Sequence, residues 1–380
     1  MIYLDCAATT LQKPPQVARA VARAISTMSS PGRGGHAAAM RAADTVLRCR
    51  EEAAALFHVP EPERVILTSN ATHALNIAVK SLAGPGTPVL VSGFEHNAVM
   101  RPLHAIGADV RVAAAPLFRP EETLRAFAEN LKGVSLVICN HVSNVFGYIL
   151  PVEEIAALCR AHHVPLIVDA SQSAGVLPVD ITQWGAAYVA MPGHKGLYGP
   201  QGTGLLLCGP GQMPKTLLEG GTGTLSALSE MPDFLPDRLE AGTHNVPGAA
   251  GLLEGLRFVR ARREKRIFLH EHALLERTVA ALSGRRNLTL FTSEGLRCQT
   301  GVLSMRFDAL DCEEAGNLLG EAGFAVRSGL HCAPAAHRSA GTFDTGTVRV
   351  SFSAFSTYSE AEAFSGAVKQ ALKTGKFTIN

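Results

Sequence analysis

The sequence predicts an α/β protein with one large, mostly parallel sheet and a smaller α+β part. Short apolar runs rich in Val, Ile and Leu alternate with segments of helical period, which is typical of βαβ units. Seven such runs occur before about residue 210, which favours a single doubly wound sheet. The chain has 380 residues, of which 47% are hydrophobic and 18% charged, so it can bury a full core.

The apolar runs predict the strands of the large sheet, and the segments between them predict its helices. Helices are expected where the apolar spacing has helical period, and three of these segments have the length of crossover helices. In such sheets ligands bind at the carboxyl ends of the strands. The strands are expected at 65–68, 89–91, 110–112, 136–138, 166–168, 188–190 and 205–207, and the helices at 71–82, 120–131 and 152–162.

The pattern changes near residue 248. A long amphipathic stretch, 248–282, is predicted to form a helix that connects two domains. Shorter elements follow, which predict a small α+β domain. They are strands at 288–290, 302–305 and 348–350, and helices at 312–321 and 359–372. We therefore expect a large domain at 13–247 and a small domain formed by 1–12 and 248–380.

Composition excludes several classes of function. The 35 Lys and Arg nearly balance the 33 Asp and Glu, and no long block of one charge suggests a nucleic acid partner. The first residues lack the basic and apolar runs of a signal peptide, and no uninterrupted apolar stretch predicts a membrane span, so a cytosolic protein is expected. The eight cysteines form no Cys-x-x-Cys pair, and no metal site is expected.

Two residues at expected strand ends predict chemistry with a carbonyl cofactor. Asp169 follows the strand at 166–168, and Lys195 stands in a glycine-rich loop after the strand at 188–190. Taken alone, an Asp at a strand end such as Asp169 is more often a cap or turn residue than a catalytic one. A lysine confined in a loop can lose its proton and form an imine, and pyridoxal phosphate uses such a lysine together with an acid for its ring nitrogen.

The loop around Lys195 does not match the common nucleotide-binding patterns. A Walker loop needs Ser or Thr after Gly-Lys, whereas Gly196 follows Lys195. A phosphate cradle is instead expected at the start of the helix at 71–82, where N-terminal amides would face an anion. Ser69 or Asn70 could also simply cap this helix, and the two roles are compatible.

These motifs, taken together and in order, resemble the cysteine desulfurase family of class V aminotransferase-fold enzymes over essentially the whole chain. The resemblance implies a fold-type-I pyridoxal phosphate enzyme that acts as a homodimer. The motifs that carry it are residues 3–10, Ala71 with Thr72, 95–97, Ser143 with Asn144, 169–172, 193–195, 240–245, 327–332 and 347–349.

The resemblance also implies a role for each site residue. Lys195 would bind pyridoxal phosphate covalently, and Asp169 would pair with its ring nitrogen. Gln172 would contact the ring hydroxyl, and His96 would stack on the ring and move protons. The phosphate would be held by Ala71, Thr72, His194 and, from the other subunit, Thr243. The substrate carboxylate would be bound by Asn144 and Arg349, with Arg327 as the next candidate. Without the family, His96 could be an ordinary loop residue and Arg349 a solvent-facing strand residue.

The resemblance implies that Cys332 is the nucleophile, and its polar, glycine-containing loop downstream of Arg327 favours a thiolate. The implied reaction converts L-cysteine to L-alanine and leaves a persulfide on Cys332 for an acceptor protein or iron–sulfur clusters. Selenocysteine lyase, cysteine sulfinate desulfinase, or another lyase or aminotransferase of this fold are the alternatives. A carrier or scaffold protein with a vestigial site is the alternative from another class.

Three residues depart from the family pattern. Cys6 stands where Asn is usual, His73 where Glu is common, and Pro192 where a phosphate-binding hydroxyl is frequent. The run 220–224, rich in Gly and Thr, is a candidate to replace the missing hydroxyl.

Overall fold

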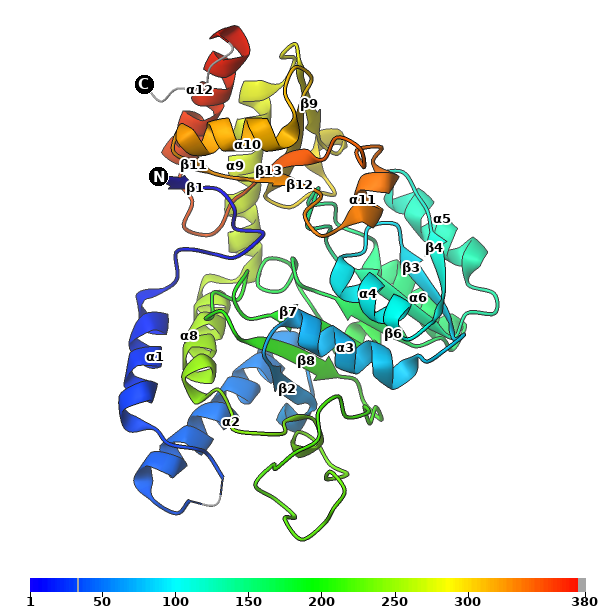
Figure 1. Cartoon of the computed structure of the whole chain (residues 1–380), viewed down its shortest axis with the longest axis vertical. Coiled ribbons are helices and arrows are strands. Elements are labelled where there is room, and N and C mark those ends of the chain that lie inside the picture. Colours follow the sequence, from blue (N-terminus) through cyan, green and yellow to red (C-terminus); the bar gives the residue numbers. More distant parts are fainter. Residues whose placement is uncertain (33, 375–380) are drawn as a thin grey trace.

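The computed structural model describes residues 1–32 and 34–374 and is built around a seven-stranded sheet (Figure 1). The order is β2-β8-β7-β6-β5-β3-β4, with β8 antiparallel to both neighbours and the other neighbouring pairs parallel. The expected fold class is therefore confirmed. The strands are β2 (Val65–Thr68), β3 (Pro88–Ser92), β4 (Asp109–Ala113), β5 (Leu136–Asn140), β6 (Leu166–Asp169), β7 (Tyr188–Pro192) and β8 (Gly204–Cys208).

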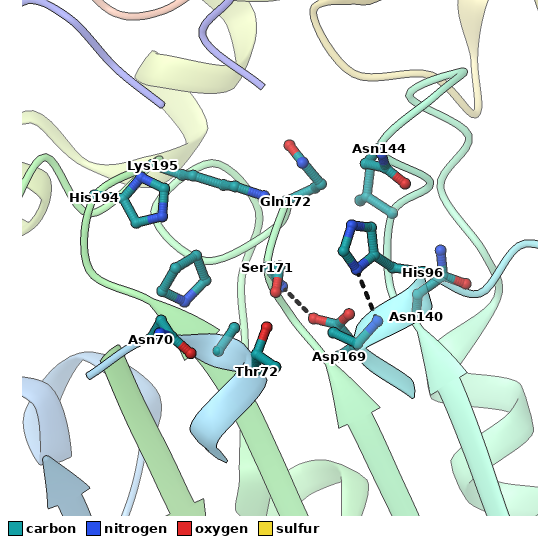
Figure 2. A pocket seen from close by; sticks show the side chains of 14 residues that line it. Asn70, Thr72, His96, Asn140, Asn144, Asp169, Ser171, Gln172, His194 and Lys195 are labelled. Carbon is teal, nitrogen blue, oxygen red and sulfur yellow. Dashed lines mark hydrogen bonds between the residues drawn. The ribbon is translucent and has the colours of Figure 1, made fainter. Parts of the chain in front are cut away.

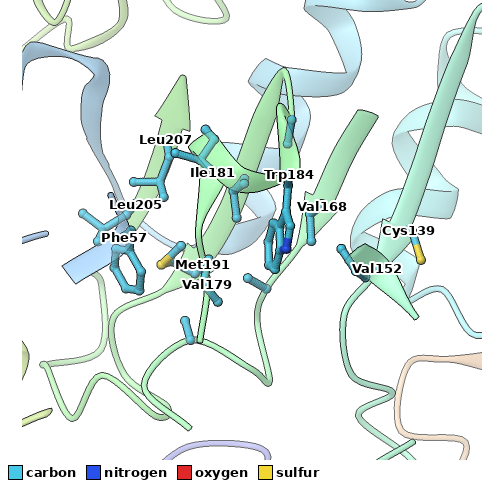
Figure 3. Packing of buried hydrophobic residues seen from close by; sticks show 14 of the residues in the cluster. Phe57, Cys139, Val152, Val168, Val179, Ile181, Trp184, Met191, Leu205 and Leu207 are labelled. Carbon is cyan, nitrogen blue, oxygen red and sulfur yellow. The ribbon is translucent and has the colours of Figure 1, made fainter. Parts of the chain in front are cut away.

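Helices cover both faces of this sheet, because successive strand residues point to opposite sides. On one face Val168 and Val189 pack with Phe57 of α2 (Ala37–Phe57) and with α5 (Pro120–Asn130) and α6 (Val152–Ala161). Figure 3 shows part of this packing around Trp184 of the short helix α7 (Ile181–Trp184).

On the other face, alternate strand residues such as Ile167 and Ala190 pack against α3 (Ala71–Leu82) and α4 (Asn97–Ala105). With both faces buried, the strands are apolar throughout, which explains why they appear in the sequence as continuous runs rather than alternating ones.

A second, antiparallel sheet follows in the C-terminal part, in the order β12-β13-β10-β9. Its strands are β9 (Leu288–Phe291), β10 (Val302–Phe307), β12 (Arg327–Gly329) and β13 (Thr347–Ser351). A separate core packs this sheet against α9 (Glu264–Leu282), α10 (Cys312–Glu321) and α12 (Tyr358–Thr374).

The first residues of the chain belong to this C-terminal part. Strand β1 (Ile2–Tyr3) pairs in parallel with β11 (Phe324–Ala325), and Leu4 is buried in the same core. The chain then runs to α1 (Pro15–Thr27), which packs on α8 (Val246–Arg262) (Figure 1). The expected domains, 13–247 and 1–12 with 248–380, stay a prediction.

The prediction of one continuous helix at 248–282 is wrong. This stretch is two helices, α8 and α9, separated by Arg263, whose φ is 69°. A left-handed residue ends a helix because it turns the chain away from the helical path, and Gly or Asn usually marks this point. Because the break falls on an arginine within a charge-dense run, the sequence carries no signal for it.

Several elements had no predicted counterpart: the short strands β1, β11 and β12, and helices α1, α2, α4, α7 and α11 (Pro334–Ser339).

In the described part of the chain no helix is long and apolar enough to cross a membrane. Nor do the described His, Cys, Asp and Glu side chains form a group that could hold a metal ion.

Candidate active site

A cleft lies at the carboxyl ends of the parallel strands, where the fold predicts a ligand (Figure 2). Its polar side chains come from strand ends and the loops that follow, and one, Thr72, comes from the first turn of α3. The cleft is lined by Asn70, Ala71, Thr72, His96, Ala98, Asn140, Val142, Asn144, Asp169, Ser171, Gln172, Pro192, His194 and Lys195. The structure thus brings together eight of the predicted site residues.

Lys195 is half-buried, and its Nζ makes no hydrogen bond with the described residues. Burial lowers the pKa of its amine to about 8, against an opposing effect of Asp169. The chain can enter the loop only because Gly196 follows, since a Cβ there would lie 2.4 Å from the carbonyl oxygen of Ala174. Lys195 is therefore a confined amine with a substantial neutral fraction near neutral pH.

Asp169 ends β6 and is buried between β5 and β7, where it pairs in register with Asn140 and Ala190. Its Oδ1 accepts a hydrogen bond of 2.9 Å from the amide of Ser171. No hydrogen bond from the described residues reaches its Oδ2. The side chain thus presents one carboxylate oxygen to the cleft (Figure 2).

His96 caps the N-terminus of α4, and its Nδ1 accepts from the amide of Ala98 over 3.0 Å. Because Nδ1 is an acceptor, the neutral ring carries its proton on Nε2. Burial lowers the pKa of His96, with further lowering from Lys195 and Arg349 and an opposing effect of Asp169. The imidazole is therefore neutral near neutral pH and has a polar N–H for the cleft.

An anion cradle stands at the start of α3. The side chain of Asn70 caps the amide of His73 over 2.8 Å, while the amides of Ala71 and Thr72 have no acceptor in the described chain. Unpaired amides at a helix N-terminus favour an anion. Asn70 therefore serves as the cap and also lines the cleft, so both roles expected for this junction are compatible.

His194 completes the cradle from the opposite side. Its Nδ1 lies 3.0 Å from the hydroxyl of Thr9, and burial lowers its pKa to about 4, with Lys195 and Lys13 acting in the same direction. The ring is therefore neutral and brings no charge to the cradle.

This donor set fits pyridoxal phosphate. The phosphate needs amides and neutral donors at a helix terminus, which Ala71, Thr72 and His194 provide. The aldehyde needs an unpaired amine, and the ring nitrogen needs an acid, which Lys195 and Asp169 provide. Gln172 also lines the cleft, although its Nε2 donates to the carbonyl of Ala7 over 2.9 Å.

Arg349 is buried, which corrects its reading as a solvent-facing strand residue: its exposed fraction is 2%. Its Nη1 donates to the carbonyl of Asn144 and its Nη2 to Oδ1 of Asp5, each over 2.8 Å. The half-exposed Arg327 donates to the other oxygen of Asp5 over 3.0 Å. Asn144 in turn donates to the carbonyl of His331 over 2.8 Å.

Cys332 is exposed at the turn between β12 and α11. It and His331 both have positive φ, 57° and 49°, so the turn is tight and conformationally strained. Two hydrogen bonds hold it, from Asn144 to His331 and from the amide of Asn97 to the carbonyl of Cys332. The cysteine loop is thus fixed to the segments that carry His96 and Asn144.

We compared the chain with models of known protein families. The model of the aminotransferase class-V family matches residues 2–364. The chain belongs to the class V aminotransferase family. The family resemblance predicted from the sequence is thereby confirmed.

Within the family, the chain is similar to proteins named cysteine desulfurases. It is 31% identical over 390 residues to a probable cysteine desulfurase of Mycolicibacterium paratuberculosis, covering 99% of this chain but 56%, a little over half, of that protein. It is 32% identical over 384 residues to one from Methanothermobacter thermautotrophicus, covering 95% and 92%. The solved apo cysteine desulfurase of Thermococcus onnurineus has a TM-score of 0.89 at 28% identity and covers 98% of this chain and 94% of that one.

One residue that the class V resemblance implies at the phosphate lies outside the cleft. Thr243 is exposed and lines a separate pocket with Glu240 and His244. Glu240 is buried and accepts from Arg50, from the amide of Leu67 and from His244. This anchoring holds the segment at the edge of the sheet and leaves Thr243 facing outward, as a contact to a second subunit would require.

The three departures from the class V pattern have different positions. Pro192 lines the cleft and offers it no hydroxyl, whereas His73 lines the separate pocket that contains Thr243. Cys6 is buried, and burial raises the pKa of its thiol to about 12. Residues 220–224 do not line the cleft of this single chain.

Three polar residues at or beside the cleft had no assigned role in the sequence reasoning. Asn140 and Ser171 line it, and Asp5 joins the two arginines beside it. Asp5 and Ser171 lie in the quoted motifs, and Asn140 lies two residues after the predicted strand at 136–138. Strand-end position was therefore the one available signal for Asn140.

Proposed function

We propose that this chain is a pyridoxal phosphate-dependent cysteine desulfurase that converts L-cysteine to L-alanine and transfers the sulfur to Cys332. The observation that carries the proposal is the opposition of an unpaired, half-buried Lys195 and a buried Asp169 in one cleft, with the exposed Cys332 tied to its rim. When bound there, pyridoxal phosphate supplies an electron sink that makes the Cα–H of an amino acid acidic.

Lys195 is the residue that would anchor this group and handle the Cα proton. A pKa of about 8 leaves a useful fraction of its Nζ unprotonated near neutral pH, which both tasks need. His96 is neutral and carries its proton on Nε2, so it can donate this N–H at the cleft. A proton would pass through the ring only if Nδ1 took one up as Nε2 released its own. Asp169 would pair with the ring nitrogen of the cofactor.

Arg349 and Asn144 would bind the substrate carboxylate. Arg349 brings a buried guanidinium close enough to the cleft to lower the pKa values of both Lys195 and His96. A charge-assisted pair in such a site is stronger than a neutral hydrogen bond. This contact would orient the amino group of cysteine toward Lys195.

Cys332 would accept the sulfur. Its thiolate attacks the sulfur of the substrate, an S–S bond forms, and the electron pair of the broken C–S bond stays on the substrate carbon, which takes up a proton. The overall balance is cysteine plus enzyme thiol giving alanine plus enzyme persulfide. Only a nucleophile of this kind removes sulfur at the oxidation level of a persulfide.

The test is to load the purified protein with pyridoxal phosphate, add cysteine and a thiol reductant, and measure alanine and sulfide. Equal amounts of both are expected. Alanine from cysteine sulfinate or selenocysteine, without sulfide from cysteine, would move the function to the alternative lyases. The same assay run with candidate acceptor proteins, such as iron–sulfur scaffolds, would identify the partner.

The homodimer and the cytosolic location belong to this proposal. The exposed Thr243 would reach the phosphate bound by the partner subunit. A single chain does not bring its own Thr243 to its own cleft. Sedimentation of the purified protein tests the dimer. Mixed dimers that carry Lys195→Ala in one subunit and Thr243→Ala in the other should keep one complete site of two.

A further inference from the structure

Asp5 lies between the two arginines beside the cleft. Its Oδ1 is 2.8 Å from Nη2 of Arg349, and its Oδ2 is 3.0 Å from Nε of Arg327. The two arginines stand directly opposite each other in the antiparallel pair of β12 and β13. Like charges in that position repel each other, and Asp5 offsets the repulsion.

Asp5 is itself fixed by the fold. It lies just after β1 and forms an isolated parallel bridge with Ser351 at the end of β13. The carbonyl of Leu4 accepts from the amide of Ser351 over 2.7 Å. The carboxylate is 8% exposed. It is thus a rigid group held by backbone pairing, unlike a flexible surface acid.

The guanidinium of Arg349 is held by two contacts, and its Nε is buried without a partner among the described residues. Nη1 donates to the carbonyl of Asn144 and Nη2 to Asp5. An unsatisfied buried donor is costly, so native structures rarely keep one without a use. A carboxylate that accepted this N–H would satisfy it with a charge-assisted hydrogen bond.

The charges of this group also match one carboxylate. Arg349 and Arg327 carry two positive charges and Asp5 one negative charge, so a single positive charge remains. The group acts electrostatically on the cleft, because Arg349 lowers and Asp5 raises the pKa of Lys195. An amino-acid substrate brings one α-carboxylate to this region.

We propose that Asp5 is a positioning residue. It holds the guanidinium of Arg349 in the orientation that leaves Nε–H for the α-carboxylate of the substrate, and Arg327 supplies the positive charge that Asp5 cancels. The proposal rests on the proposed function insofar as Arg349 receives an amino-acid carboxylate. It assigns to Asp5 a role in substrate binding and none in the chemical step.

The test compares Asp5→Asn with the wild type, and uses Asp308→Asn as the matched control. Asp308 pairs with Arg306 over 3.7 Å on the surface of the same sheet, far less buried than Asp5. Two quantities are measured: the dissociation constant of L-alanine for the holoenzyme by isothermal titration calorimetry, and KM and kcat for cysteine.

We expect Asp5→Asn to raise both the dissociation constant of alanine and the KM of cysteine about tenfold, with kcat within about twofold. Asp308→Asn should change neither. An unchanged or lower KM in Asp5→Asn would overturn the proposal, since Asp5 would then be idle or would compete with substrate. A general structural defect would lower kcat and the melting temperature as well.

A second variant keeps the test decisive if Asp5→Asn folds poorly. Arg327→Gln removes a half-exposed side chain and leaves Asp5 to neutralise Arg349, so the affinity for alanine should also fall about tenfold. An unchanged affinity would contradict the assigned charge balance. If the wild type binds alanine but forms no sulfide from cysteine, the proposed function fails while calorimetry still tests the role of Asp5.

Discussion

The backbone amide of Asn97 donates a hydrogen bond of 2.8 Å to the carbonyl oxygen of Cys332. Asn97 follows His96, which caps α4 and lines the cleft. The proposed nucleophile and the proposed proton carrier are therefore joined through one backbone contact between the C-terminal part of the chain and the large sheet. A movement of the loop that carries Cys332 would therefore also shift the position of His96.

The first prediction concerns Lys195. Borohydride reduction of the holoenzyme should attach the cofactor to this residue, and Lys195→Ala should lose both the adduct and the visible absorbance. Lys13 is the matched control, because burial also lowers its pKa to about 8 while its amine donates to Thr10. Peptide mass spectrometry that placed the adduct on Lys13 would refute the assignment.

The second prediction concerns Arg349. Replacing it by Ala removes a charge-assisted pair with the substrate carboxylate, which costs about 2 kcal/mol and should raise KM roughly thirtyfold. The same change at the surface residue Arg306 should leave KM unaltered. Steady-state kinetics at several cysteine concentrations give the answer, and an unchanged KM would place the carboxylate elsewhere, with Arg327 next in line.

The third prediction concerns Gly196, beside the lysine. In Gly196→Ala the new Cβ would meet the carbonyl oxygen of Ala174 at 2.4 Å, and a backbone group cannot move aside cheaply. We expect a loss of about 2 kcal/mol in the free energy of unfolding and weaker retention of the cofactor. Gly366→Ala, in open space on α12, is the control and should be harmless in urea titrations.

The fourth prediction concerns pH. Burial lowers the pKa of His141 from 6.5 to about 4, so between these values the unfolded chain binds a proton that the folded chain does not. Stability is therefore complete above about pH 6.5 and falls as the pH drops toward 4. At pH 5 the loss from this residue is about 2 kcal/mol.

His141→Gln should reduce the difference in unfolding free energy between pH 7 and pH 5 by about that amount. His162→Gln, at an exposed position, serves as the control. Urea titrations of both variants at the two pH values make the comparison, and an unaltered difference in His141→Gln would show that this ring is not titrating as its burial implies.

The large sheet could be predicted from the sequence because burial on both faces makes its strands continuous apolar runs. All seven runs are strands, and α3 has the predicted bounds, Ala71–Leu82. A helix break at a residue with positive φ could not be predicted in this way. Arg263 divides the expected helix at 248–282, and no Gly or Pro stands at the break to indicate it. Strands as short as β1 and β11 are too brief to show a period.

The candidate site was predictable where a residue follows a recognisable strand, as Asp169 and Lys195 do. What could not be predicted is the set of contacts between distant segments. Asp5 meets Arg349 only because the segment after β1 forms a bridge with the end of β13, and no local sequence pattern predicts this contact between the two ends of the chain. The exposed position of Thr243 likewise depends on how Glu240 is anchored.

The measurement that tests the central claim most directly is mass spectrometry of the holoenzyme after a brief exposure to cysteine without reductant. The account predicts an added sulfur on Cys332, alanine in equal amount, and no sulfide release from Cys332→Ala, whose visible spectrum should still respond to cysteine. Cys6→Ala should behave as the wild type, since burial raises the pKa of the Cys6 thiol to about 12. Wild-type sulfide release by Cys332→Ala, or added sulfur on another cysteine, would contradict the account.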